Sequence, residues 1–164
     1  MAGDIFLKAT DIEGESTDDV HGGEIEVGSF SWGAHMPVSP RSTAGSATQE
    51  KVSISDLTIM KKTDAASPAI FKATCQGTHI AEVILSVNRA DGKGGKVEYL
   101  KYTLTDSVIS RYETHGADEG GLPMETVCFS PASWKMEYVP TDPATAEGKG
   151  AKTSGWDLAL NKPL

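Results

Sequence analysis

One short segment of this chain has the signals of a helix, and most of the remaining sequence alternates apolar and polar residues as long strands do. Within residues 64–79, Ser67 is a good N-terminal cap and Pro68 suits the first helical position. Gly77 can adopt the left-handed conformation that closes a helix. These signals predict a helix of about two to three turns. A single short helix restricts the chain to folds whose body is a sheet.

Period-two alternation appears on both sides of this helix. Bulky residues share one parity in residues 24–32, 97–108, 134–138 and 156–160. We expect a slip in parity near Asp56, typical of a bulge, and a break or bend at Pro131. The predicted fold class is mainly β, a barrel or sandwich with one short helix.

Aromatic side chains on these parities are expected to form the core. In the second strand Phe30 and Trp32 share one parity, so the small residues between them face outward if the aromatic rings fill the barrel. Those outward positions are Ser29, Ser31 and Gly33. An ordinary solvent-facing strand has the same pattern, so parity alone assigns them no function. The predicted structural core residues are Phe6, Trp32, Phe71, Trp134 and Trp156.

Length and charge narrow the class of protein. A chain of 164 residues is the usual size of one domain, and we expect a single domain over residues 1–164. Lys and Arg number 15 against 23 Asp and Glu, and the net charge of −8 repels phosphate backbones, so nucleic acid is not an expected partner. No apolar run is long enough to cross a membrane. The first residues lack signal-peptide features, so we expect folding in the cytoplasm.

Two segments carry neither strand nor helix periodicity. Residues 36–49 are rich in Pro, Ser and Ala, and we expect a long exposed loop there, of a length that is usually functional in compact domains. Residues 90–95 hold a glycine cluster that no helix follows, so a hairpin turn is favoured over a phosphate-binding loop.

Residues with catalytic or metal-binding chemistry are scattered. His21 lies three residues before Glu24, a spacing that favours a hydrogen bond over metal ligation. Cys75 and Cys128 lack metal-ligand spacing and are expected to be reduced, buried thiols. Cys75 and His79 have helical spacing but lie on either side of a glycine, which argues against a catalytic pair. We therefore expect no enzyme, no catalytic residue, no metal site and no cofactor.

Several ordered motifs resemble one family. They are Asp-Ile-Phe-Leu-Lys at 4–8, Ile-Glu-Gly-Glu-Ser at 12–16, Glu-Ile-Glu-Val at 24–27, Ser-Phe-Ser-Trp-Gly at 29–33, Asp-Ala-Ala-Ser-Pro at 64–68, Val-Glu-Tyr-Leu at 97–100 and Ser-Gly-Trp-Asp at 154–157. Together they resemble the tube protein of the bacterial type VI secretion system, the hemolysin-coregulated protein family. The resemblance covers essentially the whole chain.

The resemblance implies a two-sheet β-barrel with a flanking helix that assembles as a hexameric ring. Rings of this family stack into a tube that a contracting sheath expels with a spike at its tip, and the lumen holds and protects small effector proteins. The chain would then be cytoplasmic when assembled and secreted without a signal peptide. In such a ring Ser29, Ser31 and Gly33 would line the lumen. The stacking loop would contain Val38, Pro40, Arg41, Ser42 and Thr43.

A second hypothesis is a secreted β-sandwich effector or a carbohydrate-binding module. A carbohydrate binder needs exposed aromatic rings as a platform. The three tryptophans fall on parities that indicate burial, which favours the tube subunit.

Overall fold

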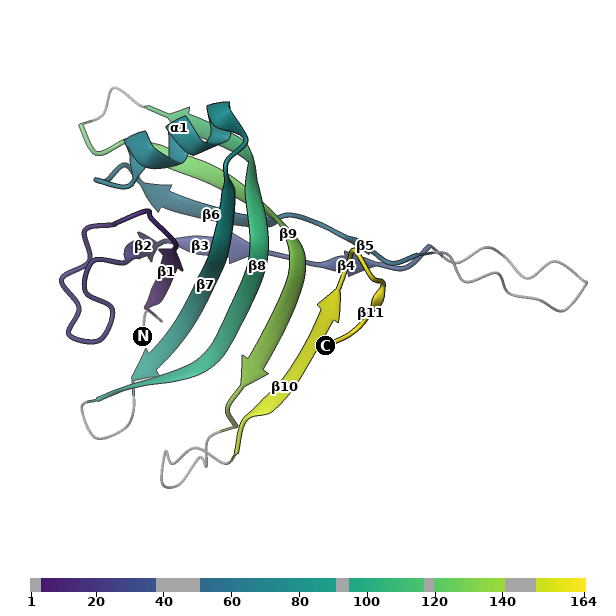
Figure 1. Ribbon diagram of the computed structural model, residues 1–164. Coiled ribbons are helices and arrows are strands. Elements are labelled where there is room, and N and C mark those ends of the chain that lie inside the picture. The colour runs from purple at the N-terminus through teal and green to yellow at the C-terminus, as the bar shows by residue number, and fades with distance from the viewer. Residues whose placement is uncertain (1–3, 38–50, 91–94, 117–119, 141–149) are drawn as a thin grey trace, which may run out of the picture.

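The computed structural model describes residues 4–37, 51–90, 95–116, 120–140 and 150–164 (Figure 1). These residues contain one helix, α1 (Ser67–Gln76), and eleven strands. The strands are β1 (Ile5–Ala9), β2 (Ile25–Val27), β3 (Ser29–Ser31), β4 (Ala34–His35), β5 (Ser53–Ile54), β6 (Leu57–Lys62), β7 (His79–Ala90), β8 (Lys96–His115), β9 (Met124–Tyr138), β10 (Lys152–Asp157) and β11 (Lys162–Pro163). The prediction of a mainly β fold with one short helix is confirmed.

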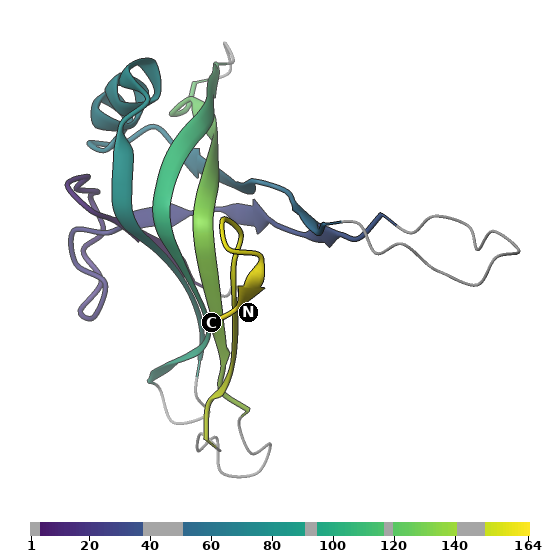
Figure 2. The same cartoon turned by 45° about the vertical axis from the view of Figure 1, so that its right-hand side comes forward.

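The main sheet divides into two branches at β9. One branch has the order β11-β10-β9-β8-β7-β1-β2, and β6 and β3 form the other branch from β9. On β9, residues 124–129 pair with β6 and residues 133–138 pair with β10, while β8 pairs along almost the whole strand. The long strands β8 and β9 therefore run through both branches (Figures 1 and 2).

The two branches also meet at Gly28, the single residue between β2 and β3. Its N–H donates to the carbonyl oxygen of Met60 at 2.8 Å. Among the described residues the strand ladder does not close, so this is an open two-branched sheet rather than a fully paired barrel. The hydrophobic core lies on the inner side of this sheet. Each fully buried apolar side chain there contributes about 1.5 to 3 kcal/mol to the free energy of unfolding. Its fully buried members include Leu7, Ile25, Leu57, Leu104 and Phe129.

The helix ends as predicted but begins differently. Gly77 has φ 61° and its N–H donates to the carbonyl oxygen of Thr74, as expected of a left-handed cap. The cap at the other end is Ala66, without a side-chain hydrogen bond, and Ser67 is the first helical residue. Because Ser67 lies inside the helix, it is not the cap, and its hydroxyl instead donates to the buried Glu125 carboxylate at 2.9 Å.

Two expected strands are divided, and one expected break is absent. The second strand is split into β2, β3 and β4, and the third is split into β5 and β6 around Asp56. Pro131 does not interrupt β9. It lies between the β6-paired and β10-paired halves of β9, where one edge of the strand has no strand partner in the described part of the chain and a missing N–H costs least.

Gly14 lies closer to backbone than any side chain allows. A Cβ at this position would stand 2.3 Å from the carbonyl oxygen of Glu24 and 2.7 Å from the nitrogen of Ile25. We expect Gly14→Ala to lower the free energy of unfolding by about 2 to 3 kcal/mol, because the two backbone segments must separate. Urea denaturation measures this loss, and Gly116→Ala is the control because nothing lies within 4 Å of its added Cβ. Equal stability of the two variants would contradict this account.

Candidate functional site

The second branch, formed by β6 and β3 beside β9 and β8, presents one exposed surface of mostly small polar side chains. We call this surface the branch face. Strand register places Ser29 beside Met60, Thr126 and Glu113 in one row across β3, β6, β9 and β8. The next row runs from Ser31 through Thr58 and Cys128 to Arg111. The branch face therefore consists of Ser29, Ser31, Thr58, Met60, Arg111, Glu113 and Thr126, whereas Cys128 belongs to the second row but is buried.

Alternation in β3 separates the branch face from the core. Ser29 and Ser31 are exposed, whereas Phe30 and Trp32 are half-buried and pack against the core. Gly33 is also exposed, and its N–H donates to the Ser55 hydroxyl at 3.0 Å. The structure thus places all three predicted lumen residues on the outward side of the second branch.

The side chains of the branch face offer a partner mainly hydrogen-bonding hydroxyl groups and one flexible apolar side chain. Its charged pair, Arg111 and Glu113, is joined at 2.6 Å, and both side chains are more than one-third exposed. An exposed pair of this kind adds little stability. Met60 is 42% exposed and contributes a flexible apolar side chain. These groups fit a surface that contacts another protein.

Four of the five predicted core aromatic residues lie at least half-buried. Phe6 is 4% exposed, and Trp134 packs edge-to-face against Trp32 with ring centroids 5.6 Å apart. Trp156 is half-buried directly across the strand ladder from Trp134. Phe71 differs from the prediction, since its side chain is 54% exposed on α1. The helix directs Ile70 and Ala73 into the core, which leaves Phe71 on its outer side.

A buried charge network fixes the start of α1 to β6 and β9. The Lys61 ammonium lies 2.7 Å from a Glu125 oxygen and 2.8 Å from an Asp64 oxygen, and the Lys61 and Glu125 side chains are fully buried. Lys61 also donates to the Ser67 hydroxyl at 3.1 Å. The other Glu125 oxygen accepts from the Tyr112 hydroxyl at 2.9 Å. Sequence reasoning missed this network, although Lys61 shares the inward parity of β6.

The network determines the protonation of Glu125. Burial raises the pKa of this carboxyl, but hydrogen bonds from Lys61, Ser67 and Tyr112 outweigh burial and hold the pKa below its ordinary value of 4.5. Because the folded-state pKa is depressed, this contribution to stability is complete above pH 4.5 and is lost as pH falls through the folded-state pKa.

Proximity of Ser67 to Lys61 does not create a nucleophile. A general base needs a free lone pair, and here the Lys61 side-chain nitrogen is engaged by the Asp64 and Glu125 carboxylates. The Ser67 hydroxyl already donates to Glu125, and its residue is 5% exposed, so substrate has no access. The network therefore acts in folding.

The other candidates for chemistry have structural partners. His21 and Glu24 form the predicted hydrogen bond at 2.8 Å. Cys75 is exposed, contrary to the expectation of a buried thiol, while Cys128 is buried. Within the residues described, no group of three or more His, Cys, Asp or Glu is arranged to hold a metal ion.

Lys96 joins two distant parts of the chain at the start of β8. Its ammonium lies 2.6 Å from both the Asp4 and the Asp18 carboxylates and 5.8 Å from the centre of the Phe6 ring. The hydrogen bond from Lys96, followed by that from the Val20 N–H, lowers the pKa of Asp18 from 3.8 to about 2. A depressed pKa stabilises the fold above pH 3.8, and this contribution is lost as pH falls toward about 2.

We therefore expect Lys96→Met to raise the pKa of Asp18 toward 3.8. The value should stay below 3.8 because the backbone N–H groups of Val20 and His21 still donate to this carboxylate. A titration of side-chain carboxyl carbon shifts by NMR measures it. Lys101→Met, which removes a partner of Glu98, is the control. An unchanged Asp18 pKa in Lys96→Met would contradict the assignment.

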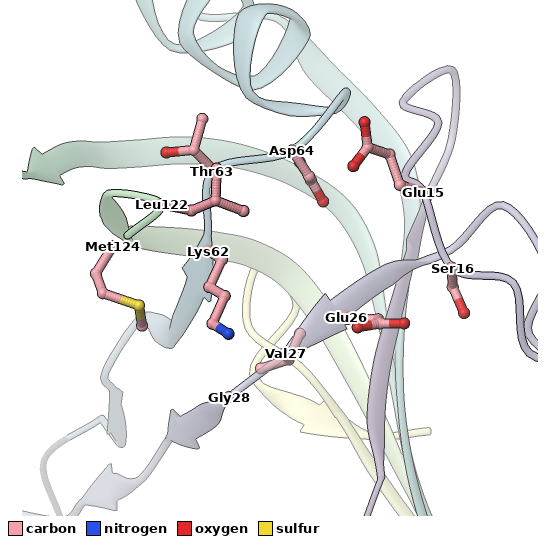
Figure 3. A pocket seen from close by; sticks show the side chains of 10 residues that line it. All are labelled: Glu15, Ser16, Glu26, Val27, Gly28, Lys62, Thr63, Asp64, Leu122 and Met124. Carbon is pink, nitrogen blue, oxygen red and sulfur yellow. The ribbon is translucent and has the colours of Figure 1, made fainter. Parts of the chain in front are cut away.

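A pocket of about 340 Å³ opens where β2 and β6 diverge (Figure 3). Among its charged side chains, Glu15 and Glu26 lie on one side and Lys62 lies on the other. No ion pair among the described residues joins Lys62 to either glutamate. The remaining lining residues are Ser16, Val27, Gly28, Thr63, Asp64, Leu122 and Met124.

The predicted stacking residues Val38, Pro40, Arg41, Ser42 and Thr43 lie outside the described residues. Their flanking strands β4 and β5 pair with each other as a separate two-stranded ladder. This ladder extends away from the main sheet (Figures 1 and 2).

Comparisons with known proteins agree with this architecture. A sequence model of the family described as "Type VI secretion system effector, Hcp" matches residues 6–138. Protein hcp1 of Pseudomonas aeruginosa is 32% identical over 161 residues, which cover 98% of each chain. The crystal structure of Hcp1 from Salmonella typhimurium has a TM-score of 0.82 and 38% identity, with all of both chains covered. A structure described as a type six secretion system protein has a TM-score of 0.91 and 32% identity, covering 99% of this chain and 100% of the other.

The chain is therefore a secretion-system protein with a two-branched β fold, and it belongs to the Hcp family of the type VI secretion system. This family is a structural secretion family and not a known enzyme family. Among the described residues, α1 is too short to cross a membrane.

Proposed function

We propose that this chain is the subunit of a hexameric ring whose copies stack into the type VI secretion tube. A contracting sheath expels this tube with a spike at its tip, and the lumen holds and protects small effector proteins. Assembly takes place in the cytoplasm before secretion. The observation that carries the proposal is a pair of unpaired strand edges on either side of the branch face.

One free edge belongs to β8. Strand β7 pairs with β8 as far as His79 opposite Val108, and beyond that point β8 continues to His115 with β9 as its single strand partner among the described residues. The other free edge belongs to β3, whose strand partner in the described residues is β6 alone. Unpaired edges of this kind are templates for pairing with another chain.

Strand direction allows these two edges to pair with each other between copies. Neighbours are antiparallel throughout β3, β6, β9 and β8, so β8 and β3 run in opposite directions. Placing β3 of a second copy beside β8 continues the antiparallel order. A contact between two different edges is head-to-tail, and such contacts close into rings when the rotation permits.

A closed ring of six copies joins their branch faces into one continuous inner surface. Ser29, Ser31 and Gly33 would then line the lumen, where hydroxyl groups and Met60 contact cargo. The stacking role belongs to the segment containing Val38 to Thr43, and it is supported by β4 and β5, the described strands on either side, which extend away from the main sheet.

The alternative of a carbohydrate-binding module has less support. Such a module needs an exposed aromatic platform. Trp32 and Trp134 instead pack against each other and against the core.

Thr114→Pro tests the edge pairing directly. Arg111 lies opposite Cys128, whose carbonyl oxygen faces β8 because it accepts from the Ser110 hydroxyl. Alternation therefore directs the Thr114 N–H away from β9 and toward the free edge. Proline removes that N–H while the hydrogen bonds to β9 remain, so we expect a folded monomer in place of rings. Light scattering on a sizing column gives the mass, and Thr114→Ala is the control. Rings of normal mass from Thr114→Pro would overturn the pairing.

A further inference from the structure

The outer side of α1 carries an aromatic side chain that the single chain leaves uncovered. Phe71 is 54% exposed and stacks on Tyr112 of β8, with ring centroids 5.0 Å apart and planes 23° apart. Single exposed apolar residues are common on protein surfaces. This one differs because it forms a stacked pair with a second ring at a sheet edge.

The buried charge network holds Tyr112, one ring of this pair, in place. The Tyr112 hydroxyl donates to Glu125, which is fully buried and ion-paired with Lys61. The same network holds Ser67 at the start of α1. Tyr112 is therefore held in place within the single chain, and Phe71 stacks on it. A preordered aromatic surface loses little side-chain entropy when it is covered.

The location of the pair identifies the partner. Tyr112 lies between Val108 and His115, the part of β8 without β7 beside it. A strand that pairs with this edge brings its own chain next to α1, which packs on β8. In the proposed ring that strand is β3 of the next copy.

We propose that Phe71, supported by Tyr112, is the aromatic anchor of the subunit interface and is covered by the adjacent copy of this chain. This inference rests on the proposed ring function. Energetically dominant interface residues are typically aromatic, central and fully desolvated on binding. Phe71 becomes such a residue only when the ring closes.

Phe71→Glu measures the contribution of the anchor. We expect the protein concentration at which half of the chains are assembled to be at least about tenfold higher than for the wild type, because a charge replaces a ring that the interface buries. Leu160→Glu is the matched control, since Leu160 is 64% exposed on the turn between β10 and β11. Mass photometry over a dilution series gives the midpoint. Equal midpoints for Phe71→Glu and the wild type would overturn the inference.

Cys75 provides a second measurement that leaves Phe71 unchanged. This exposed cysteine lies one helical turn after Phe71 and so on the same side of α1. In a Cys128→Ala background, we expect a maleimide to label Cys75 at least about tenfold more slowly in assembled rings than in monomers obtained by dilution below the assembly midpoint. Equal labelling rates would show that this side of α1 stays open in the ring and would refute the anchor.

The two proposals fail in different ways. Monomeric wild-type protein at every concentration would refute the ring and the anchor together. Hexameric wild-type protein, with Phe71→Glu assembling normally and Cys75 labelled rapidly, would refute the anchor alone.

Discussion

Replacing Lys61 by Met is expected to lower the free energy of unfolding by about 3 to 5 kcal/mol. The substitution leaves Glu125 fully buried without its counter-ion and removes the contact to Asp64 at the start of α1. An unpaired buried carboxylate is costly, and the pKa of Glu125 should rise above its ordinary value as the group takes up a proton. Chemical denaturation at neutral pH measures the loss.

The adjacent residue is the natural control for this substitution. Lys62 has the same side chain on the exposed parity of β6, so Lys62→Met should change stability by no more than about 0.5 kcal/mol. Replacing both charges, as Lys61→Met with Glu125→Leu, should recover part of the loss because no buried charge is then left unpaired. A loss below about 1 kcal/mol for Lys61→Met would mean that the network does not stabilise the fold.

Ser31→Gln is expected to produce intact rings that no longer hold cargo. Ser31 is exposed on β3 and directed away from the core, so a longer side chain leaves folding and melting near normal. Six copies place that added bulk on one inner surface, and small losses at equivalent contacts multiply. We expect co-purified effector to fall by roughly tenfold or more and its half-life in cells to shorten.

Ser154→Gln is the control for this variant, because Ser154 is also exposed on a strand but belongs to β10 of the other branch. Equal effector half-lives with intact rings would show that the branch face does not hold cargo. Failure of Ser31→Gln to form rings would place Ser31 at a subunit contact instead.

The sequence predicted secondary structure well at positions where a single residue type restricts the backbone conformation. Pro68 and Gly77 located α1 because their allowed conformations fit its ends. Alternation located most strands and predicted that Ser29 and Ser31 lie opposite Phe30 and Trp32. These are properties of neighbours along the chain.

The sequence did not predict features that depend on distant residues. Ser67 is of a residue type that favours the N-cap, but it lies one position inside the helix, where its hydroxyl donates to Glu125 of β9. Phe71 has the composition of a core residue, yet the packing of α1 on β8 leaves it outside. The free edge of β8 exists because β7 begins at His79, opposite Val108, and that of β3 because β6 is its single strand partner among the described residues. Only the tertiary register shows these limits.

The mass of the purified protein under native conditions tests the central claim most directly. The ring account predicts a closed species with six times the 17.3 kDa mass of the chain at micromolar concentration, together with multiples of that mass where rings stack. A sample that remains entirely at 17.3 kDa across the accessible concentration range would contradict it.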